Sequence, residues 1–261
     1  MAMWNIDTQA YLANNKTLFE AFQIADKDGN IINTFGAASN IPIAAGLVDG
    51  YSHINKFGYT GTDINGTSTI WDHNGTTAEY PYPAAGVVTV TGGNSDNDGD
   101  TVEVQGLDAD YNLQTVNVAV GASTTETFSR VFRARMVTAD NTTDISISIN
   151  GTVVAKILDG NGQTLMSVYT IPAGKTGYLM QIMGTMDKAN APVKFKLFAR
   201  PFGNGFNLKG QFGTQGGNPI NYQYSVPLVF TEKTDIKVNV ETAGAVGCGA
   251  TFDLILVDNP A

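Results

Sequence analysis

Short runs of alternating apolar and polar residues, each bounded by Gly, Pro or Asn, recur along most of this chain. Such runs are typical of half-buried β-strands, because successive side chains of a strand point to opposite faces. The clearest pair is Asp144–Ile149 and Thr152–Ile157, which Asn150-Gly151 joins. Because Asn-Gly readily adopts the positive φ angles of a two-residue type I′ turn, we predict a β-hairpin here.

Similar alternation predicts strands across the rest of the chain. A second hairpin is expected from Thr101–Gln105 and Leu113–Val120, on either side of a turn-rich segment. Further strands are expected at Thr127–Val137, Thr164–Ile171, Thr176–Met186, Val193–Arg200, Ile220–Phe230, Asp235–Glu241 and Ala250–Val257. No segment after Tyr80 shows a convincing helical period. The sequence therefore predicts an all-β protein, an antiparallel β-sandwich with a jelly-roll-like arrangement.

The N-terminal part of the chain is more irregular than the rest. We predict an N-terminal arm or lobe over residues 1–83 and a β-sandwich region over residues 84–261, which can divide into two smaller sandwiches near residue 160. Tyr80-Pro-Tyr-Pro-Ala84 is the best linker candidate, because proline disfavours helix at its own position and at the one before.

Two interpretations compete within the first forty residues. Thr17 and Glu20 match a helix capping box that leads into the stretch ending at Ala25. Phe22–Ala25 and Ile31–Phe35, separated by a polar five-residue segment, fit a β-hairpin equally well. We favour the hairpin.

Charge and composition exclude several classes of function. The 261 residues include 15 Lys plus Arg against 24 Asp plus Glu, a formal net charge of −9. A negative surface repels nucleic acid and anionic lipid, so we expect neither as a partner. The longest apolar stretch, Ile41–Val48, is far short of the roughly 20 residues of a membrane-spanning helix. The start, Met1–Asp7, lacks the features of a signal peptide, so we expect synthesis in the host cytoplasm.

Little in the sequence points to catalysis or metal binding. Asn94–Asp100 resembles the start of a calcium loop, but Gln105 stands where a bidentate Glu is needed, so an exposed acidic loop is the simpler interpretation. His53 and His73 lack the further well-placed ligands of a zinc site. Cys248, the single cysteine, cannot form an intramolecular disulfide and is expected to be a small buried residue. We therefore expect no catalytic, cofactor or metal site.

A series of segments, taken in order, resembles a family of virion structural proteins of tailed bacteriophages. The resemblance runs from about Ile41 to the C-terminus, and no single motif is diagnostic. The segments that carry it are Val102–Asn112, Phe128–Ala134, Gln163–Met166, Tyr169–Tyr178, Arg200–Gly203, Pro227-Leu228, Glu232–Ile236 and Phe252–Asn259.

The resemblance implies a non-enzymatic component of the phage particle. Within that class we expect a capsid decoration or cement protein on the capsid exterior, which clamps the major capsid protein and forms a homotrimer or another homo-oligomer. The alternative is a protein of the tail, neck or fibres that contacts the host surface or its glycans. The expected interface residues are large apolar side chains, which often anchor protein contacts: Trp4, Leu18, Phe19, Phe22, Ile24, Trp71, Phe202 and Phe206.

Overall fold

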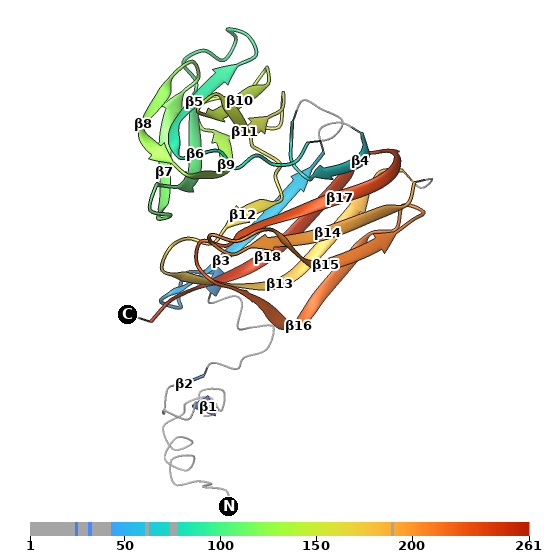
Figure 1. Cartoon of the computed structure of the whole chain (residues 1–261). Coiled ribbons are helices and arrows are strands. Elements are labelled where there is room, and N and C mark those ends of the chain that lie inside the picture. The colour runs from blue at the N-terminus through green and yellow to red at the C-terminus, as the bar shows by residue number, and fades with distance from the viewer. Residues whose placement is uncertain are drawn as a thin grey trace, which may run out of the picture. The chain divides into compact units, whose positions relative to one another are not determined.

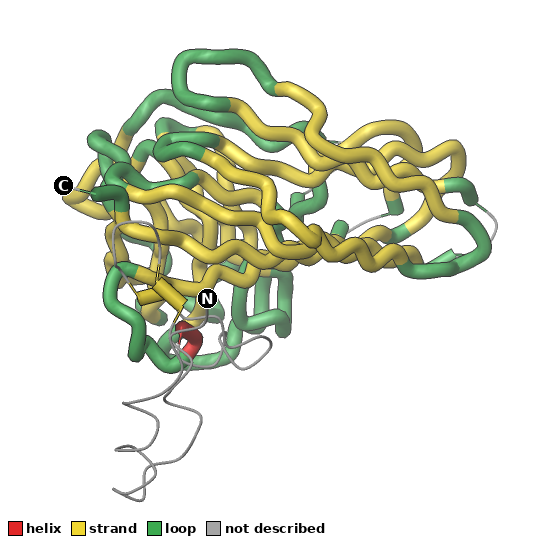
Figure 2. The backbone as a smooth tube through the Cα atoms, turned by 90° about the horizontal axis from the view of Figure 1, so that it is seen from below, coloured by secondary structure: helices red, strands yellow, loops and turns green. Residues whose placement is uncertain are grey.

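The computed structural model describes residues 24–25, 31–32, 43–60, 63–73, 78–188 and 191–260. The chain forms two compact units, Met1–Asp49 and Gly50–Ala261. In the first unit, β1 (Ile24–Ala25) pairs antiparallel with β2 (Ile31–Ile32), with Ile24 opposite Ile32. This pairing confirms the predicted hairpin over the helix for these residues. Strand makes up most of the described chain, and a single helical turn begins at Ile43 (Figure 2).

The second unit contains two antiparallel sandwiches, so the predicted all-β class is confirmed (Figure 1). We call the larger one the major sandwich. One of its sheets has the order β16-β13-β18-β3; the other has the order β12-β17-β14-β15, with β4 also pairing with β17. Its strands are β3 (Tyr51–Tyr59), β4 (Ile64–Thr69), β12 (Val168–Thr170), β13 (Lys175–Met186), β14 (Val193–Arg200), β15 (Asn207–Thr214), β16 (Ile220–Phe230), β17 (Asp235–Val246) and β18 (Cys248–Asp258).

The smaller one, which we call the minor sandwich, is inserted in the chain between β4 and β12 of the major one. Its sheets have the orders β11-β10-β5-β8 and β7-β6-β9. Its strands are β5 (Gly86–Gly92), β6 (Thr101–Leu107), β7 (Leu113–Ala119), β8 (Ser123–Phe128), β9 (Arg130–Met136), β10 (Ile145–Ile149) and β11 (Thr152–Ile157). The chain leaves it after Ile157 and enters β12 at Val168, a passage that spans the predicted division near residue 160.

The predicted boundary of the N-terminal arm at residue 83 needs correction. β3 pairs along its whole length with β18, and β4 pairs with β17, so both belong to the major sandwich. The compact unit begins at Gly50 instead. β3 is hard to recognise in the sequence, because its partners lie about two hundred positions away and its buried side includes Lys56.

Local turn chemistry explains the predicted hairpins. Asn150 and Gly151 have φ angles of 49° and 76°, and they connect β10 to β11 with Ile149 opposite Thr152. The second predicted hairpin is β6 paired with β7, with Leu107 opposite Leu113. Both predictions are confirmed.

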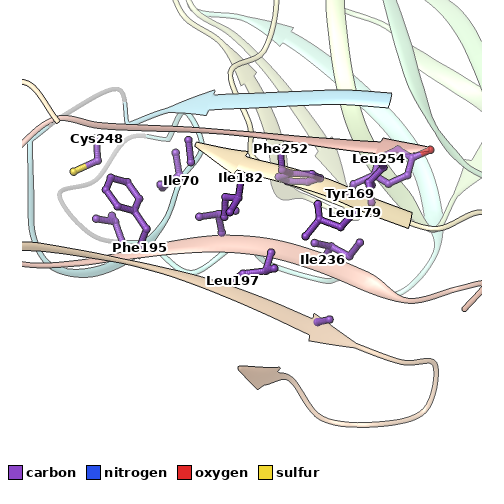
Figure 3. Packing of buried hydrophobic residues seen from close by; sticks show 14 of the residues in the cluster. Ile70, Tyr169, Leu179, Ile182, Phe195, Leu197, Ile236, Cys248, Phe252 and Leu254 are labelled. Carbon is purple, nitrogen blue, oxygen red and sulfur yellow. The ribbon is translucent and has the colours of Figure 1, made fainter. Parts of the chain in front are cut away.

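Each sandwich encloses its own apolar core. In the major sandwich, Phe195 and Leu197 of β14 pack with side chains of the opposite sheet, including Ile182 of β13 and Phe252 of β18 (Figure 3). All four are fully buried. The core of the minor sandwich consists largely of β-branched residues such as Val88, Val104, Ile145, Ile147 and Ile149. Burying a large aliphatic or aromatic side chain stabilises the folded state by about 1.5–3 kcal/mol.

One close backbone approach in the minor sandwich requires glycine. A Cβ atom on Gly106 of β6 would lie 2.0 Å from the carbonyl oxygen of Arg130 and 2.8 Å from the Phe128 ring. Gly213 of β15 is an exposed strand glycine whose Cβ would meet nothing within 4 Å. Both glycines lie in strands, but only Gly106 is closely approached, so Gly213 serves as the control position for a substitution at Gly106.

We expect Gly106→Ala to lower the free energy of unfolding by about 1–3 kcal/mol, because the added methyl must displace backbone in a packed interior. Gly213→Ala should change it by no more than about 0.5 kcal/mol. Urea unfolding of both variants measures the difference. Equal stability of the two variants would contradict the close approach.

Candidate functional site

The structure describes only some of the predicted interface residues, and these differ in exposure. Trp4, Leu18, Phe19 and Phe22 lie outside the described residues, and of Ile24 only the backbone, in β1, is described. Phe202 is 62% exposed, and Phe206 is half-buried in the same loop region.

Trp71 is not available as an interface anchor, because only 4% of it is exposed. Its ring lies 5.2 Å from that of Tyr80 in an edge-on arrangement, and its backbone forms a β-bridge with Met166. Trp71 therefore contributes to the core of the minor sandwich. The sequence interpretation missed this, because an aromatic residue in an irregular segment has the same appearance whether it packs inward or outward.

A buried ionic cluster lies where β14 ends, directly before the loop that contains Phe202 and Phe206. Asp235 begins β17, directly opposite Arg200 at the end of β14. The Arg200 Nε and Nη2 atoms donate to Asp235 Oδ2 at 2.9 and 2.6 Å. Arg130, at the start of β9 in the minor sandwich, donates from Nε to Oδ1 at 2.8 Å and from Nη2 to Oδ2 at 3.2 Å. Thr170 of β12 adds a hydroxyl donor to Oδ1 at 2.6 Å.

The charged groups of this cluster are largely enclosed by the protein. The side chain of Asp235 is 4% exposed and that of Arg130 is 12% exposed. Burial alone would lower the pKa of Arg130, but the hydrogen bonds and negative charge of Asp235 outweigh it and raise that pKa. Two guanidinium groups share one carboxylate, so the cluster carries one net positive charge.

Aromatic rings surround both guanidinium groups. Arg200 lies 4.3 Å from the ring centre of Tyr82 and 4.5 Å from that of Phe206. Arg130 lies 5.1 Å from Tyr82 and 5.4 Å from Tyr111. These distances are typical of cation–π contacts, which add to the hydrogen bonds in fixing the two arginines.

A cavity of about 410 Å³ opens beside this cluster. We call it the arginine pocket. Tyr82–Ala85 come from the linker into the minor sandwich, and the remaining residues come from loops and strand ends of both sandwiches. Its lining consists of Tyr82, Pro83, Ala84, Ala85, Ala109, Tyr111, Ser129, Arg130, Arg200, Phe202, Gly203, Asn204 and Asp235.

The sequence did not reveal this pocket. Arg130, Arg200 and Asp235 lie 35 to 105 positions apart, and nothing local marks any of them as a site residue. Tyr82 was identified from the sequence only as part of the linker candidate, and Phe202 only as an expected interface residue. The signal that comes nearest is that Arg130, Arg200 and Asp235 each fall in a segment that carries the phage resemblance.

A second surface feature is the nearly uncharged edge of the major sandwich. β15 and β16 each pair with a single neighbour, β14 and β13 respectively, and each ends its sheet. The Phe212 ring of β15 and the Tyr222 ring of β16 lie 5.2 Å apart. Lys209 is the sole charged residue in the sequence between Pro201 and Phe230. The large apolar side chains exposed on these two strands, which define the β15–β16 face, are Leu208, Tyr222, Val226 and Val229.

Several titratable groups away from these features have shifted pKa values. Burial raises the pKa of Asp72 to about 7, and one of its carboxyl oxygens has no hydrogen-bond partner among the described residues. Burial lowers the pKa of Lys56, whose ammonium group donates to the carbonyl of Phe132. Burial also raises the pKa of Cys248 to about 12, so the thiol is protonated at neutral pH.

The acidic loop and the histidines are engaged in local contacts. The loop lies between β5 and β6, where Asn94 and Asp96 bond to each other and Asn97 donates to Asp100 at 2.8 Å. His53 lies 3.2 Å from Asp253, whereas His73 is buried beside Trp71. Within the described ranges, no group of three or more His, Cys, Asp or Glu is placed to hold a metal ion. None of the described residues forms a helix long and apolar enough to cross a membrane.

The architecture defines an all-β protein of two antiparallel sandwiches. No protein-family model matches the chain, and no curated protein matches it in sequence. Among solved structures, it is similar to the infectious bursal disease virus Gx strain, with 12% identity and a TM-score of 0.20, over 81% of this chain and 76% of that chain.

Two further structures from the same virus are similar at the same level. The VP2 subviral particle gives 10% identity and a TM-score of 0.20 over 81% of this chain and 77% of that chain. The T13 viral particle gives 13% identity and a TM-score of 0.21 over 81% and 74%. Likeness at this level carries no argument about function, so the site must be interpreted from its own residues.

We expect Asp235→Asn to lower the free energy of unfolding by about 3–5 kcal/mol, because it leaves two partly buried guanidinium groups without their counter-charge. Glu103→Gln is the matched control, since its partner Arg135 is largely exposed, and its effect should be much smaller. Thermal and urea unfolding measure both variants. A loss from Asp235→Asn no larger than that from the control would contradict a buried ionic link.

Proposed function

We propose that this chain is a non-enzymatic structural component of a viral particle. The observation that carries the proposal is the β15–β16 face, where exposed apolar and amide side chains replace charge. The cores of protein interfaces are depleted of charged residues and enriched in aromatic residues, whereas ordinary surfaces are not. Exposed Tyr222, Val226 and Val229, which lie along one edge strand, fit such a contact.

The partner that fits this face best is another copy of the same chain. Each copy carries a net charge of −9, so two copies repel one another wherever their charged surfaces meet. Contact through the β15–β16 face avoids that repulsion. The β16 register shifts between its pairings with Leu179 and Gln181, so residues 224–227, which include Val226 and Pro227, have no partner in the ladder. A bulge and a proline disfavour the addition of another strand, so side-chain packing is the expected mode of contact.

The particle we propose is that of a tailed bacteriophage, with this chain as a decoration protein on the outside of its capsid. It would assemble as a homotrimer or another homo-oligomer and clamp the major capsid protein. Binding only the assembled lattice stabilises that lattice, as any ligand selective for one state does. Support comes from the resemblance, since three of the segments that carry it contribute Arg130, Arg200 and Asp235 to one cluster.

The predicted interface residues of the N-terminal segment are part of this proposal. Trp4, Leu18, Phe19, Phe22 and Ile24 fall within residues 1–49, the first of the two units. We propose that they anchor this unit on a neighbouring subunit, with Phe202 and Phe206 of the second unit as further contacts. The second candidate, a protein of the tail, neck or fibres that contacts host glycans, is favoured by the aromatic lining of the arginine pocket.

Copy number per virion separates these two locations. We expect quantitative mass spectrometry of purified particles to find this chain at a level comparable to the major capsid protein, because a decoration protein repeats with the lattice. A level far below that of the capsid protein would contradict decoration and favour the tail, neck or fibres. Absence from the purified particle would contradict both.

We expect Val226→Asp to weaken self-association at least tenfold, about 1.4 kcal/mol, because each copy would bring a new negative charge into the contact. Val226 is 78% exposed, so the folded monomer should tolerate the change. Val137→Asp, at an exposed position in the minor sandwich, is the matched control and should leave association unchanged. Sedimentation equilibrium measures all three proteins. Equal association of the wild type and Val226→Asp would contradict the proposed face.

A further inference from the structure

We infer that the arginine pocket binds an acidic saccharide, with the sugar carboxylate at Arg200 and the sugar ring over Phe202. This inference rests on the second candidate function, contact with host glycans, and does not require the β15–β16 face. It assigns Phe202 to ligand binding in place of a subunit contact.

The charge of the pocket favours a single carboxylate. Asp235 neutralises one of the two guanidinium groups, and Lys233 lies 5.5 Å from the Phe202 ring at the margin of the pocket. The guanidinium charge that Asp235 leaves uncompensated favours an anion at this place in a chain of net charge −9. Because Asp235 remains among the lining residues, a monoanion is better matched than a phosphate dianion.

Arg200 has donors left to bind such an anion. Its Nε and Nη2 atoms are bonded to Asp235, but its Nη1 group has no hydrogen-bond partner among the described residues. The Arg200 side chain is 25% exposed and lines the pocket. A guanidinium group that is already oriented by a carboxylate and by stacked rings binds a second carboxylate with little loss of side-chain entropy.

The unpaired hydroxyl of Tyr82 favours a ligand that itself has hydroxyl groups. Tyr82 lines the pocket, and its hydroxyl oxygen is buried without a hydrogen-bond partner among the described residues. Leaving such a group unpaired costs about 1–3 kcal/mol. Because this oxygen is covered by protein, a ligand must displace its neighbours to reach it; a sugar hydroxyl would then satisfy it, since both groups can donate and accept.

The shape of the pocket suits a ring. Phe202 stands exposed at its margin, held edge-on against Tyr111 with ring centres 5.6 Å apart. Besides the aromatic and charged residues, the lining contains the polar Ser129 and Asn204 and a group of small apolar residues: Pro83, Ala84, Ala85, Ala109 and Gly203. A volume of about 410 Å³ falls in the ordinary range of small-molecule sites.

A peptide is a poorer fit than a saccharide. Extended peptides are commonly bound through a free strand edge, whose backbone groups pair with those of the peptide. Here the carbonyl oxygens of Ala84 and Ala85 already accept from the side-chain amide of Asn150, at 3.0 and 3.4 Å. The Arg200 Nη1 and the Tyr82 hydroxyl, which have no hydrogen-bond partner among the described residues, are side-chain groups suited to a compact polar molecule.

The test measures binding of three probes to the full chain by titration calorimetry and ligand-observed NMR. The probes are glucuronic acid, glucose and an acidic dipeptide. We expect glucuronic acid to bind at least tenfold more tightly than glucose, since only the acid has a carboxylate for Arg200. Absence of glucuronic acid binding, or equal binding of the two sugars, would overturn the inference. Tighter binding of the dipeptide would overturn the saccharide as the ligand class.

Two variants with matched controls locate the binding. Tyr82→Phe should weaken glucuronic acid binding about threefold to tenfold, the value of one hydrogen bond. Tyr224→Phe removes another buried, unpaired hydroxyl outside the pocket lining and should leave binding unchanged. Phe202→Ala should weaken binding by a similar factor, and Leu208→Ala, an exposed apolar position outside the lining, should not. Unchanged affinity in both Tyr82→Phe and Phe202→Ala would overturn the assignment to this pocket.

Discussion

The ionic link between Asp235 and two arginines is the constraint on which much of this molecule depends. Arg130 comes from β9 of the minor sandwich, Arg200 from β14 and Thr170 from β12, and all three donate to the same carboxylate on β17. A buried carboxylate without partners is very costly, so this group holds four strands in a fixed arrangement. It also ties an inserted domain to the sheet that flanks the insertion.

The same ionic link leaves one guanidinium charge without a counter-charge, and this charge is available to bind a ligand. One carboxylate neutralises only one of two guanidinium groups, and two of the rings that orient them, Tyr82 and Tyr111, also line a cavity. The β15–β16 face has the opposite character, with apolar side chains, amides and a single lysine. One chain thus offers a charged pocket suited to a small anion and an uncharged edge suited to another protein.

The predictions of secondary structure were correct where neighbouring residues specify the conformation. Asn150-Gly151 specifies its turn through two backbone conformations, and period-two alternation in β10 and β11 selects the buried face, so that hairpin needs no distant partner. β3 and β4 were missed because their ladders are formed with β17 and β18 at the other end of the chain. The ionic site was missed for the same reason, since Arg130 and Asp235 are 105 positions apart.

The sequence by itself determined the all-β class, the hairpin turns, the acidic charge and the absence of a disulfide within the chain. Each of these follows from residue type or from neighbours a few positions apart. Only the tertiary structure decided which strands pair, that Trp71 packs inward, and that Arg130, Arg200 and Asp235 share one site. These outcomes depend on burial and on contacts between distant segments, and such contacts form only when the whole sheet order is in place.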